Sequence, residues 1–419
     1  MAEVKNKIRL GSGDYVNYST NSNSSSLYIG NKYMFLSDIL SLFGKKTIYP
    51  RFRIFVLNPD ESVCYQIPNE DILAGGSYNE NYQNGSRRSL SFSLNNQDGK
   101  YTPSINKFWT NAKVSLQLGV EIPEENSSIW FNKGVFVMNT PSPSKGVEKK
   151  TVSINCSDKF SILEGKLGTV SETTEFSSGT EIKNIIEDIL FQDSGNGVFL
   201  DPIVMRYHPS FEGKTLPQSI SAAAGSSWAS LLLQIADILS AEIFYDSNGC
   251  LNIIPVVETM SDGSKPVISN YSLADLQNED FSFEMESFVN CIYVIGANIN
   301  GKTVMAKSIN DDPSSPLCVS RIGLRVGDIV NDSNITSDSL AQERADYELR
   351  KKLIAKSTLN SSVFFNPLLT VNNIVTYTDE EDYELRRERF LIQSLSFNLD
   401  YNGLMSLQVS NINNLPFIS

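Results

Sequence analysis

The chain of 419 residues has little of what most catalytic designs need, beginning with a single histidine, His208. No Gly-x-Ser-x-Gly motif precedes this histidine, as a hydrolase triad on an α/β sheet requires. The sequence also lacks a P-loop, a dinucleotide-binding glycine pattern and any His/Cys cluster with the spacing of metal ligands. We therefore predict no catalytic, cofactor-binding or metal-binding residue. A lone histidine next to a proline is typical of a packed or surface loop.

Cysteine is also sparse, and no two of the five cysteines form a C-x-x-C pair. They are Cys64, Cys156, Cys250, Cys291 and Cys318. Cys156 and Cys291 stand in apolar strand patterns, so we interpret them as buried, reduced thiols. Synthesis in a reducing cytoplasm fits this use of cysteine.

Positive charge and long apolar runs are lacking too. The formal net charge is −13, so the average surface repels nucleic acid, whose binding needs clustered Lys and Arg. This argues against stable nucleic-acid binding, whereas a passage through which DNA slides remains compatible. The sequence contains no run of 18 or more apolar residues, so no membrane-spanning segment is predicted. The first 20 residues lack the apolar core of a secretion signal.

What the chain does contain is enough apolar sequence for two to four domains. Residues 1–45 begin with a Ser/Asn-rich stretch at 19–26, which buries little apolar surface. Apolar residues from Tyr33 to Phe43 then come at helical spacing, closed by Gly44. We predict that residues 1–45 form an N-terminal arm with a short helix.

Residues 46–164 read as a first β domain. Short alternating segments are separated by turn signals, a pattern typical of a barrel or sandwich. The predicted strands are Arg51–Leu57, Ser89–Leu94, Val114–Leu118, Gly134–Met138 and Thr151–Cys156.

Residues 165–265 predict a small α/β domain. One helix with isoleucines at 182, 185, 186 and 189 is capped by Thr180, and a second begins after Ser226 or Ser227 and carries Trp228. Two apolar strands then flank the turn at Asn248-Gly249, which is a strong hairpin signal.

Residues 266–419 predict a second β domain, which includes a helix at 339–356. A boundary-like segment, 261–266, precedes it. The helix carries a stripe of Ala341, Ala345, Leu349 and Leu353, which is too short for a coiled coil and favours packing on a sheet.

The ends of the two β regions share a layout. Phe136–Thr140 precedes a turn-rich gap and then Ser153–Ser157, while Phe390–Ser394 precedes a gap and then Ser406–Ser410. Alternating strands resemble one another, so coincidence is the competing interpretation. A true duplication predicts two similar β barrels that flank the α/β domain.

One segment carries a family resemblance. Arg88–Pro103, RSLSFSLNNQDGKYTP, with Phe108-Trp109, Lys113 and Leu118-Gly119-Val120, resembles the hub proteins of phage baseplates and tail tips. Those proteins often show a strand, a "D-G-x-Y-x-P" turn and a "W…K" approach to the next strand. Further similar segments are Asn132–Val137, Ser157–Lys159, Leu163–Gly165, Tyr245–Gly249, Ile253–Pro255 and Phe390–Leu395. The resemblance covers about residues 50–410, and it is the order and spacing that carry it, since no single motif is diagnostic.

The resemblance implies an α+β, mainly β protein, with two tail-tube-like β-barrel domains flanking a small α/β domain. It implies a homotrimer whose six barrel-like domains match a sixfold tail tube in a phage or a phage-derived particle. The function implied is a structural hub in the baseplate or tail tip, not an enzyme. Its partners are the tail tube protein, the spike or tip protein, other baseplate proteins and a tape-measure protein. The interface elements we expect are residues 1–45 and the turn at 98–103. Acidic stretches at 121–125 and 379–382 are candidates for an acidic lumen, or else are solvated loops.

Two other functions remain open from the residues alone. A tail-associated glycoside hydrolase needs only two carboxylates, and Glu242, Asp246 or Glu284 are candidates that nothing singles out. A tip protein that binds host sugars would use exposed aromatic side chains. The candidates for that role are Tyr78, Tyr82 and Trp130, with core or interface packing as the alternative.

Overall fold

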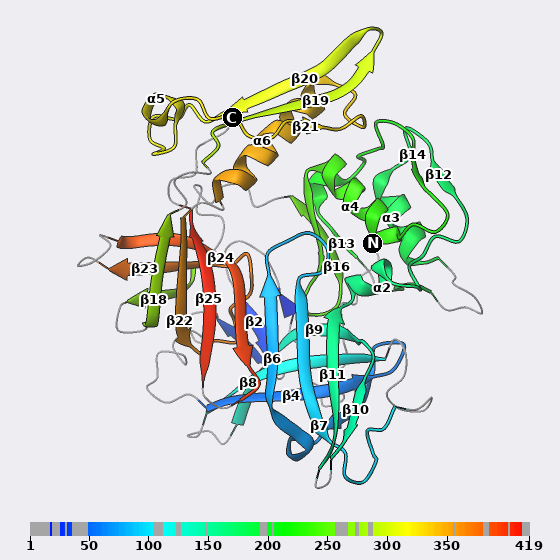
Figure 1. Cartoon of the computed structure of the whole chain (residues 1–419), viewed down its shortest axis with the longest axis vertical. Coiled ribbons are helices and arrows are strands. Elements are labelled where there is room, and N and C mark those ends of the chain that lie inside the picture. Colours follow the sequence, from blue (N-terminus) through cyan, green and yellow to red (C-terminus); the bar gives the residue numbers. More distant parts are fainter. Residues whose placement is uncertain are drawn as a thin grey trace.

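Figure 1 shows the computed structural model of the chain. The residues that it describes are 17–18, 26–29, 32–35, 49–103, 112–122, 127–146, 149–192, 199–202, 205–255, 267–272, 276–283, 288–354, 357–379, 385–400 and 403–412. Strands dominate and shorter helical segments accompany them, which confirms the predicted α+β, mainly β class.

A 14-stranded sheet forms the body of the molecule, and two sets of strands build it. The first repeat contains β4 Tyr49–Leu57, β5 Val63–Ile67, the 3-10 helix η1 Asn69–Asp71, β6 Ile72–Asn81, β7 Arg88–Asn95, β8 Lys113–Ile122, β9 Ser127–Met138, β10 Ser142–Lys145 and β11 Lys150–Asp158. The second repeat contains β17 Val267–Ser272, β18 Leu276–Phe283, β22 Ser357–Phe364, β23 Ile374–Asp379, β24 Leu385–Asn398 and β25 Leu404–Asn411. The predicted alternation decides the faces: Leu90, Phe92 and Leu94 point into the core, and the serines between them point away.

The two repeats have the same strand order. Neighbours in the first are β6-β7-β11-β9-β8-β4, and in the second they are β18-β22-β25-β24-β23-β17. The register agrees as well, because Phe136 pairs with Asp158 as Phe390 pairs with Asn411. One difference is that β4 runs antiparallel to β8 whereas β17 runs parallel to β23. The correspondence predicted between Phe136–Thr140 and Phe390–Ser394 is thus present in the sheet.

The two repeats do not form two closed barrels among the described residues. β24 is 14 residues long, and its second half pairs with β25 on one side and with β6 of the first repeat on the other. One open sheet therefore runs from β18 to β5, and a single hydrophobic core contains residues of both repeats. At the joint the rings of Tyr78 and Phe397 stack, with centroids 4.8 Å apart. No closed barrel is detected among the described strands, and the two tail-tube-like barrels expected from the resemblance stay a prediction.

The predicted α/β unit comes after the first repeat in the chain. It contains α2 Phe160–Glu164, β12 Thr174–Phe176, α3 Ile182–Leu190, β13 Arg206–Tyr207, the 3-10 helix η3 Pro209–Phe211, β14 Ile220–Ala222, α4 Trp228–Leu239, β15 Ala241–Tyr245 and β16 Leu251–Pro255. The hydroxyl of Ser227 caps α4 by accepting from the Ser230 N–H at 3.3 Å, as predicted. α3 differs, since it begins after Glu181 without a side-chain cap. Glu181 instead forms an extended bridge with Thr215, which displaces the start from the predicted Thr180 cap.

A second, smaller unit lies between β18 and β22 and extends from the sheet at the top of Figure 1. It contains β19 Cys291–Ile299, β20 Lys302–Ile309, α5 Val319–Ile322, β21 Val330–Asn331 and α6 Asp338–Ile354. The predicted stripe of α6 is buried against the separate sheet of β19 and β20. On its other side, Arg344 reaches α4 and donates to the Asp237 carbonyl at 2.8 Å.

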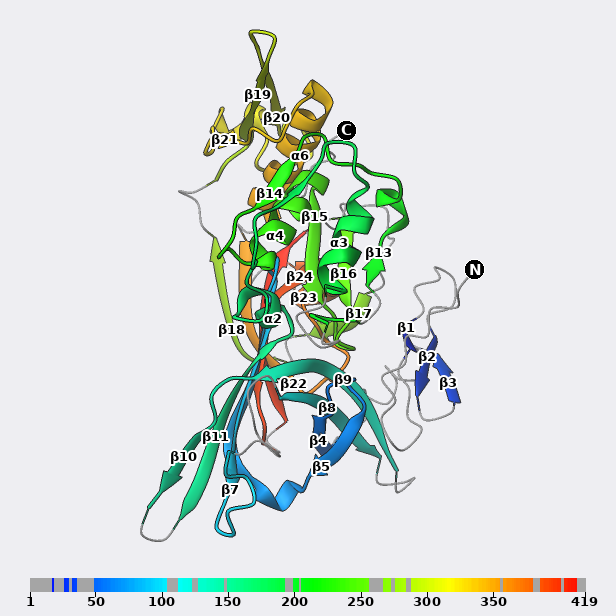
Figure 2. The same ribbon diagram turned by 90° about the vertical axis from the view of Figure 1, so that its right-hand side faces the viewer.

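The N-terminal segment contains a separate sheet of β1 Asn17–Tyr18, β2 Ser26–Ile29 and β3 Lys32–Phe35. Figure 2 shows it apart from the large sheet. The prediction of a helix from Tyr33 is wrong at its beginning, where β3 pairs with β2. The Gly30-Asn31 pair between these strands is a hairpin signal that outweighs the helical spacing. Residues 36–43 of that predicted helix lie outside the described residues.

Candidate functional site: a buried polar junction and an uncharged sheet face

Arg88, at the start of β7, joins three parts of the chain. Its guanidinium pairs with Glu80 of β6 at 2.5 Å and also donates to the Tyr245 carbonyl of the α/β unit. The hydroxyl of Thr370, in the second repeat, donates to the same Glu80 carboxylate at 2.6 Å. The side chain of Glu80 is fully buried and that of Arg88 is nearly so. The contact between the two repeats therefore depends on a buried ion pair that the α/β unit also touches.

Arg87 forms a second ion pair beside the first. It contacts Glu242 of β15 at 2.9 Å, and both side chains are buried. The hydroxyl of Tyr82 donates to the same carboxylate, and the Asn372 amide lies 3.4 Å from it. The Arg87 guanidinium also lies 3.6 Å from the centre of the Phe244 ring. This pair attaches the α/β unit to the loop before β7 and to the second repeat.

Lys159 forms the centre of a third buried cluster. Its ammonium group lies 2.7 Å from Glu61 and 2.8 Å from Asp201, and it donates to the Gly249 carbonyl at 2.9 Å. Burial disfavours the charged amine, but the two carboxylates outweigh this and raise the pKa of Lys159. The β4–β5 turn of the first repeat is thereby connected to two loops of the α/β unit.

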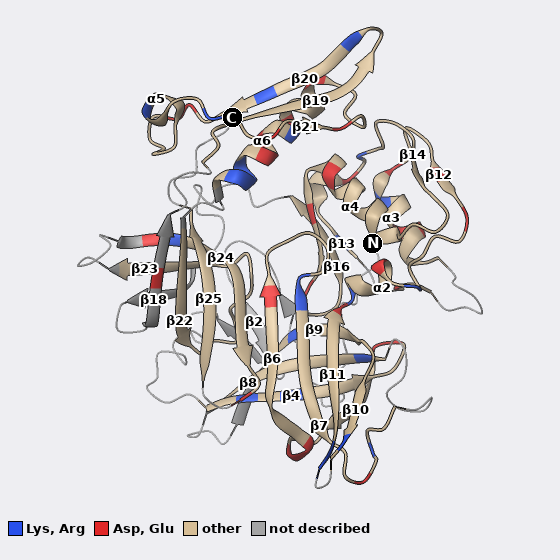
Figure 3. Ribbon diagram, viewed as in Figure 1, with Lys and Arg blue, Asp and Glu red and all other residues tan. Residues whose placement is uncertain are grey.

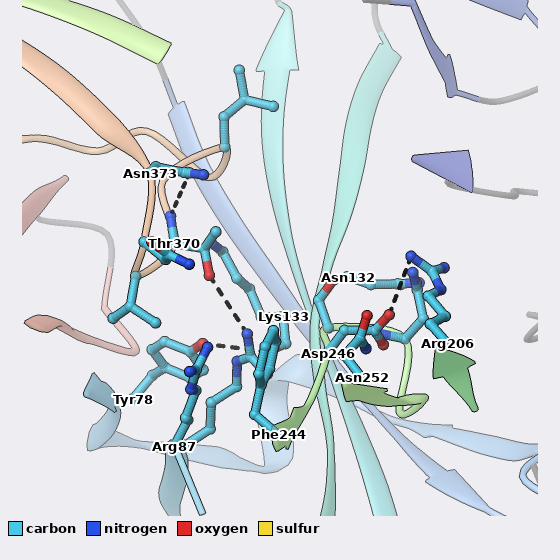
Figure 4. A pocket seen from close by; sticks show the side chains of 16 residues that line it. Tyr78, Arg87, Asn132, Lys133, Arg206, Phe244, Asp246, Asn252, Thr370 and Asn373 are labelled. Carbon is cyan, nitrogen blue, oxygen red and sulfur yellow. Dashed lines mark hydrogen bonds and ion pairs between the residues drawn. The ribbon is translucent and has the colours of Figure 1, made fainter. Parts of the chain in front are cut away.

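Arg87 and Arg88, together with Thr370 and Asn372, contribute to the lining of a pocket of about 250 Å³ (Figure 4). Side chains from both repeats and from β15 and β16 line it, among them Arg87, Lys133, Asn252 and Thr370. Lys133 donates to the Leu369 carbonyl across the joint between the repeats. Burial lowers the pKa of Lys133 to about 8, opposed by Glu80 and reinforced by Arg88. The acids of the junction are each held by a cation or hydroxyl donor, so the arrangement suits a mechanical connection between the units.

Of the carboxylates considered for glycoside hydrolysis, the two that the structure describes each have local partners. Glu242 is in the Arg87 ion pair. Asp246 accepts from the Asn248 and Cys250 N–H groups within the β15–β16 turn and lies 3.4 Å from Arg206. Glu284 lies outside the described residues.

His208 is exposed and serves a local structural purpose. It caps η3 and accepts from the Ser210 N–H at 3.2 Å. The interpretation as a loop residue is confirmed. The cysteines are all unpaired, and Cys156 and Cys291 are buried as predicted.

The aromatic residues considered for sugar binding have other surroundings. Tyr78 is fully buried and belongs to the core, so it is not available to a sugar. Tyr82 is in the Glu242 network. Trp130 is partly buried with the Arg53 guanidinium 4.1 Å from its ring. Packing explains the placement of all three.

The turn at 98–103 is held by its own contacts. Tyr101 is buried, its N–H donates to the Asn96 side chain at 2.7 Å, and its hydroxyl donates to Asp71. Gly99 adopts a φ of 74°, which favours glycine. Of the acidic stretches, Glu121 pairs with Arg51, and residues 123–126 and 380–384 lie outside the described residues.

Of the junction residues, Glu242, Tyr78 and Tyr82 were candidates for other roles, whereas its remaining charged residues were not candidates on sequence grounds. Glu80, Arg88 and Lys133 are charged residues at inward positions of strands, where an apolar residue is expected. That interruption is the signal by which they could have been found. Their partners are not predictable from it, since Glu80 and Thr370 are 290 residues apart.

Over β7, β22 and β25, the sheet face opposite the core carries no charged side chain. β22 and β25 contain no charged residue and β7 contains only Arg88 at its first position, and Figure 3 shows how few charges these strands carry. Small hydroxyls pair across this face, such as Ser93 with Ser153 at 3.0 Å and Ser77 with Ser91 at 2.9 Å. A shallow groove over β18, β22, β25 and β24 is lined by Ser, Asn and Gln together with Asp280 and Leu407.

Comparison with known proteins reveals the same fold in solved structures. The 43 kDa tail protein of prophage MuSo2 from Shewanella oneidensis matches with a TM-score of 0.54 and 16% identity, over 87% of this chain and 99% of that chain. A tail protein from Neisseria meningitidis matches with a TM-score of 0.57 and 10% identity, over 87% and 97%. A chain of the Francisella PdpA-VgrG complex matches with a TM-score of 0.51 and 10% identity, over 88% and 59%. The predicted resemblance to phage tail proteins is thus confirmed at the level of the fold.

Sequence comparisons add little to this. The family described as "Domain of unknown function (DUF5048)" matches residues 314–415, which is about a quarter of the chain. No curated protein matches the sequence. Among the helices of the described residues, none is long and apolar enough to cross a membrane.

Proposed function

We propose that the chain is a structural hub of a phage-type tail, located in the baseplate or tail tip of a virion or of a phage-derived particle. Three copies form a ring that closes the tail tube and connects it to the spike or tip protein. The observation that carries the proposal is the repeated strand order within one chain, because three copies then supply six equivalent modules. A sixfold tube can dock on six equivalent modules without a symmetry mismatch.

The fold shared with prophage tail proteins over nearly their whole length supports this role. The buried ion pairs support it as well, because a part that transmits force needs its repeats and its α/β unit to move together. Breaking a buried pair costs several kcal/mol, so the Arg88 and Lys159 clusters oppose separation of the units.

The uncharged sheet face supports a channel lining. Small neutral side chains neither attract a polyanion nor repel it, and DNA that passes along them has no cations to bind. We therefore place the face that carries Ser93, Ser153 and Gln408 toward the lumen, with residues 1–45 and 98–103 as contacts to other tail parts, such as the tube or tape-measure protein.

The test is the mass of the purified chain in solution, by native mass spectrometry or sedimentation. Three chains of 46.6 kDa give about 140 kDa, and averaged electron micrographs of that species should show a ring with pseudo-sixfold features. A monomer at all concentrations, or a twofold particle, would contradict the proposal. Clearing of purified cell wall by the isolated protein would instead establish the glycoside hydrolase alternative.

A further inference from the structure

The joint between the two repeats within one chain is an antiparallel strand pairing with a defined register. Beyond a bulge at Gln393, β24 pairs with β6 so that Ser396 faces Asn79 and Phe397 faces Tyr78. Two backbone hydrogen bonds mark the ends of this pairing, from the Tyr82 N–H to the Gln393 carbonyl and from the Leu399 N–H to the Gly76 carbonyl. The odd-numbered residues of β24 therefore direct their N–H and C=O groups toward β6. Ser396 and Asn79 consequently form a non-hydrogen-bonded pair.

Each strand of this joint has a counterpart in the other repeat, and both counterparts are sheet edges among the described residues. β10 corresponds to the second half of β24. The register against β11 shifts by one residue between Met138 and Ser142, as the register of β24 against β25 shifts at its bulge. Ser142 then pairs with β11 as Ser396 pairs with β25. β18 corresponds to β6, since it pairs with β22 as β6 pairs with β7. Among the described strands, β10 pairs only with β11, and β18 only with β22.

The two edges lie on opposite sides of the sheet in Figure 1, and in Figure 2 β10 projects with β11 at the lower end of the molecule. All four residues of β10 are exposed. An exposed edge strand presents unpaired N–H and C=O groups, which can pair with another chain unless something covers them. The position of the two edges means that one chain cannot satisfy both by pairing them with each other within the same open sheet.

We propose that β10 of one copy pairs antiparallel with β18 of the next copy, in the register that the internal joint uses. Ser142 then faces Ser282, Pro143 faces Phe281 and Ser144 faces Asp280 of the neighbouring copy. This deepens the proposed hub function, on which it rests, by naming the strands through which the copies join. The ring becomes a continuous sheet in which joints within chains alternate with equivalent joints between chains.

The proline of β10 explains why the contact is heterologous. Gly146 donates to the Lys149 carbonyl at 2.8 Å, so even-numbered residues of β10 point toward β11 and Pro143 points outward. Proline has no N–H, and so the outward edge of β10 accepts at this position without donating. In the proposed register the Phe281 N–H of the neighbouring copy can donate to the Pro143 carbonyl, whereas two β10 edges paired about their prolines bring two carbonyls together without a donor. A head-to-tail contact of this kind does not give a twofold dimer, and it generates a ring when its rotation closes.

Disulfide cross-linking tests the register. In a background with the exposed Cys64 changed to serine, Ser142→Cys with Ser282→Cys places two cysteines at a non-hydrogen-bonded pair, where Cα atoms lie about 4.5 Å apart. Mild oxidation should yield covalent dimers and trimers on a non-reducing gel. The second pair in register, Ser144→Cys with Asp280→Cys, should do the same.

Three controls accompany these variants. Ser396→Cys with Asn79→Cys should form the equivalent bond within one chain and leave the monomer band. Ser142→Cys with Asp280→Cys is diagonal, roughly 7–8 Å apart, and should link much less. A mixture of single variants Ser142→Cys and Ser282→Cys, assembled together, should stop at covalent dimers.

The outcomes separate this inference from the hub proposal. A particle of about 140 kDa that links only out of register, or not at all while the internal control links, refutes the β10–β18 contact and leaves the hub intact. A chain that stays monomeric refutes both. Equal linking of the in-register and diagonal pairs reports random collision and also refutes the contact.

Discussion

Arg88→Met should destabilise the protein strongly, because it leaves the Glu80 carboxylate buried without its cation. The pair is 2.5 Å long, and the two side chains are 5% and 0% exposed. Burial alone opposes the charged form of Glu80, but Arg88 and Lys133 reverse this and lower its pKa. Removing one partner of a buried pair costs about 3–5 kcal/mol, and we expect the free energy of unfolding to fall by that amount.

The double variant Arg88→Met, Glu80→Leu tests the cause. With both charges gone, neither Glu80 nor Arg88 is left buried without the other, so the double variant should lose less than the sum of the single variants by about 2 kcal/mol or more. A residual cost of about 1–3 kcal/mol remains, because the hydroxyls of Tyr78 and Thr370 lose their acceptor.

Guanidinium denaturation followed by circular dichroism measures these differences, at one protein concentration because assembly shifts apparent stability. Lys302→Met is the matched control: its partner is Asp338, both side chains are well exposed, and less than about 1 kcal/mol should be lost. If Arg88→Met behaves like Lys302→Met, or if the single and double variants are strictly additive, an unpaired buried charge is not the source of the cost.

Three further changes test other parts of the structure. Burial lowers the pKa of Lys133 to about 8, whereas the same group in the unfolded chain has a pKa of 10.5. The unfolded chain therefore binds more protons between pH 8 and 10.5, and the free energy of unfolding should rise with pH across this range. Lys133→Met should remove roughly 3 kcal/mol of that rise, and an unchanged slope of unfolding free energy against pH would contradict the prediction. Ser227→Ala removes the cap of α4 and should cost about 1 kcal/mol, visible as a lower thermal midpoint that Ser227→Asp largely restores. Gly119→Ala brings a methyl group to 2.7 Å from the Trp130 ring and should cost about 1–3 kcal/mol, which Trp130→Leu in the same chain should reduce; a wild-type midpoint for Gly119→Ala would exclude this close packing.

Several elements were predictable because neighbours in sequence decide them. The alternation of Ser89–Leu94 specifies a strand with one apolar face, and β7 contains it. The Asn248-Gly249 turn specifies a hairpin, and β15 and β16 form it. The stripe of α6 specifies a buried helix face, and it packs on β19 and β20. In each case, residues close together in the sequence are enough to specify the element that forms.

Other elements were not predictable because partners distant in sequence decide them. Tyr33–Phe35 shares helical spacing with the apolar residues up to Phe43, yet it pairs as β3. Ser142–Lys145 contains a proline and few apolar residues, yet β11 holds it as the strand β10. The parallel pairing of β17 with β23 has no local signal, because only the course of the chain between them decides its direction.

The sequence by itself determined the mainly β class and the places of most strands and helices, and it indicated a correspondence between the two repeats. Only the tertiary structure decided that the repeats share one open sheet, that Glu80, Arg88 and Thr370 meet at their joint, and that β10 and β18 are left as edges among the described strands. The physical reason is range. Alternation and turn chemistry act over a few residues, whereas strand pairing and buried charge compensation depend on which distant segments arrive side by side.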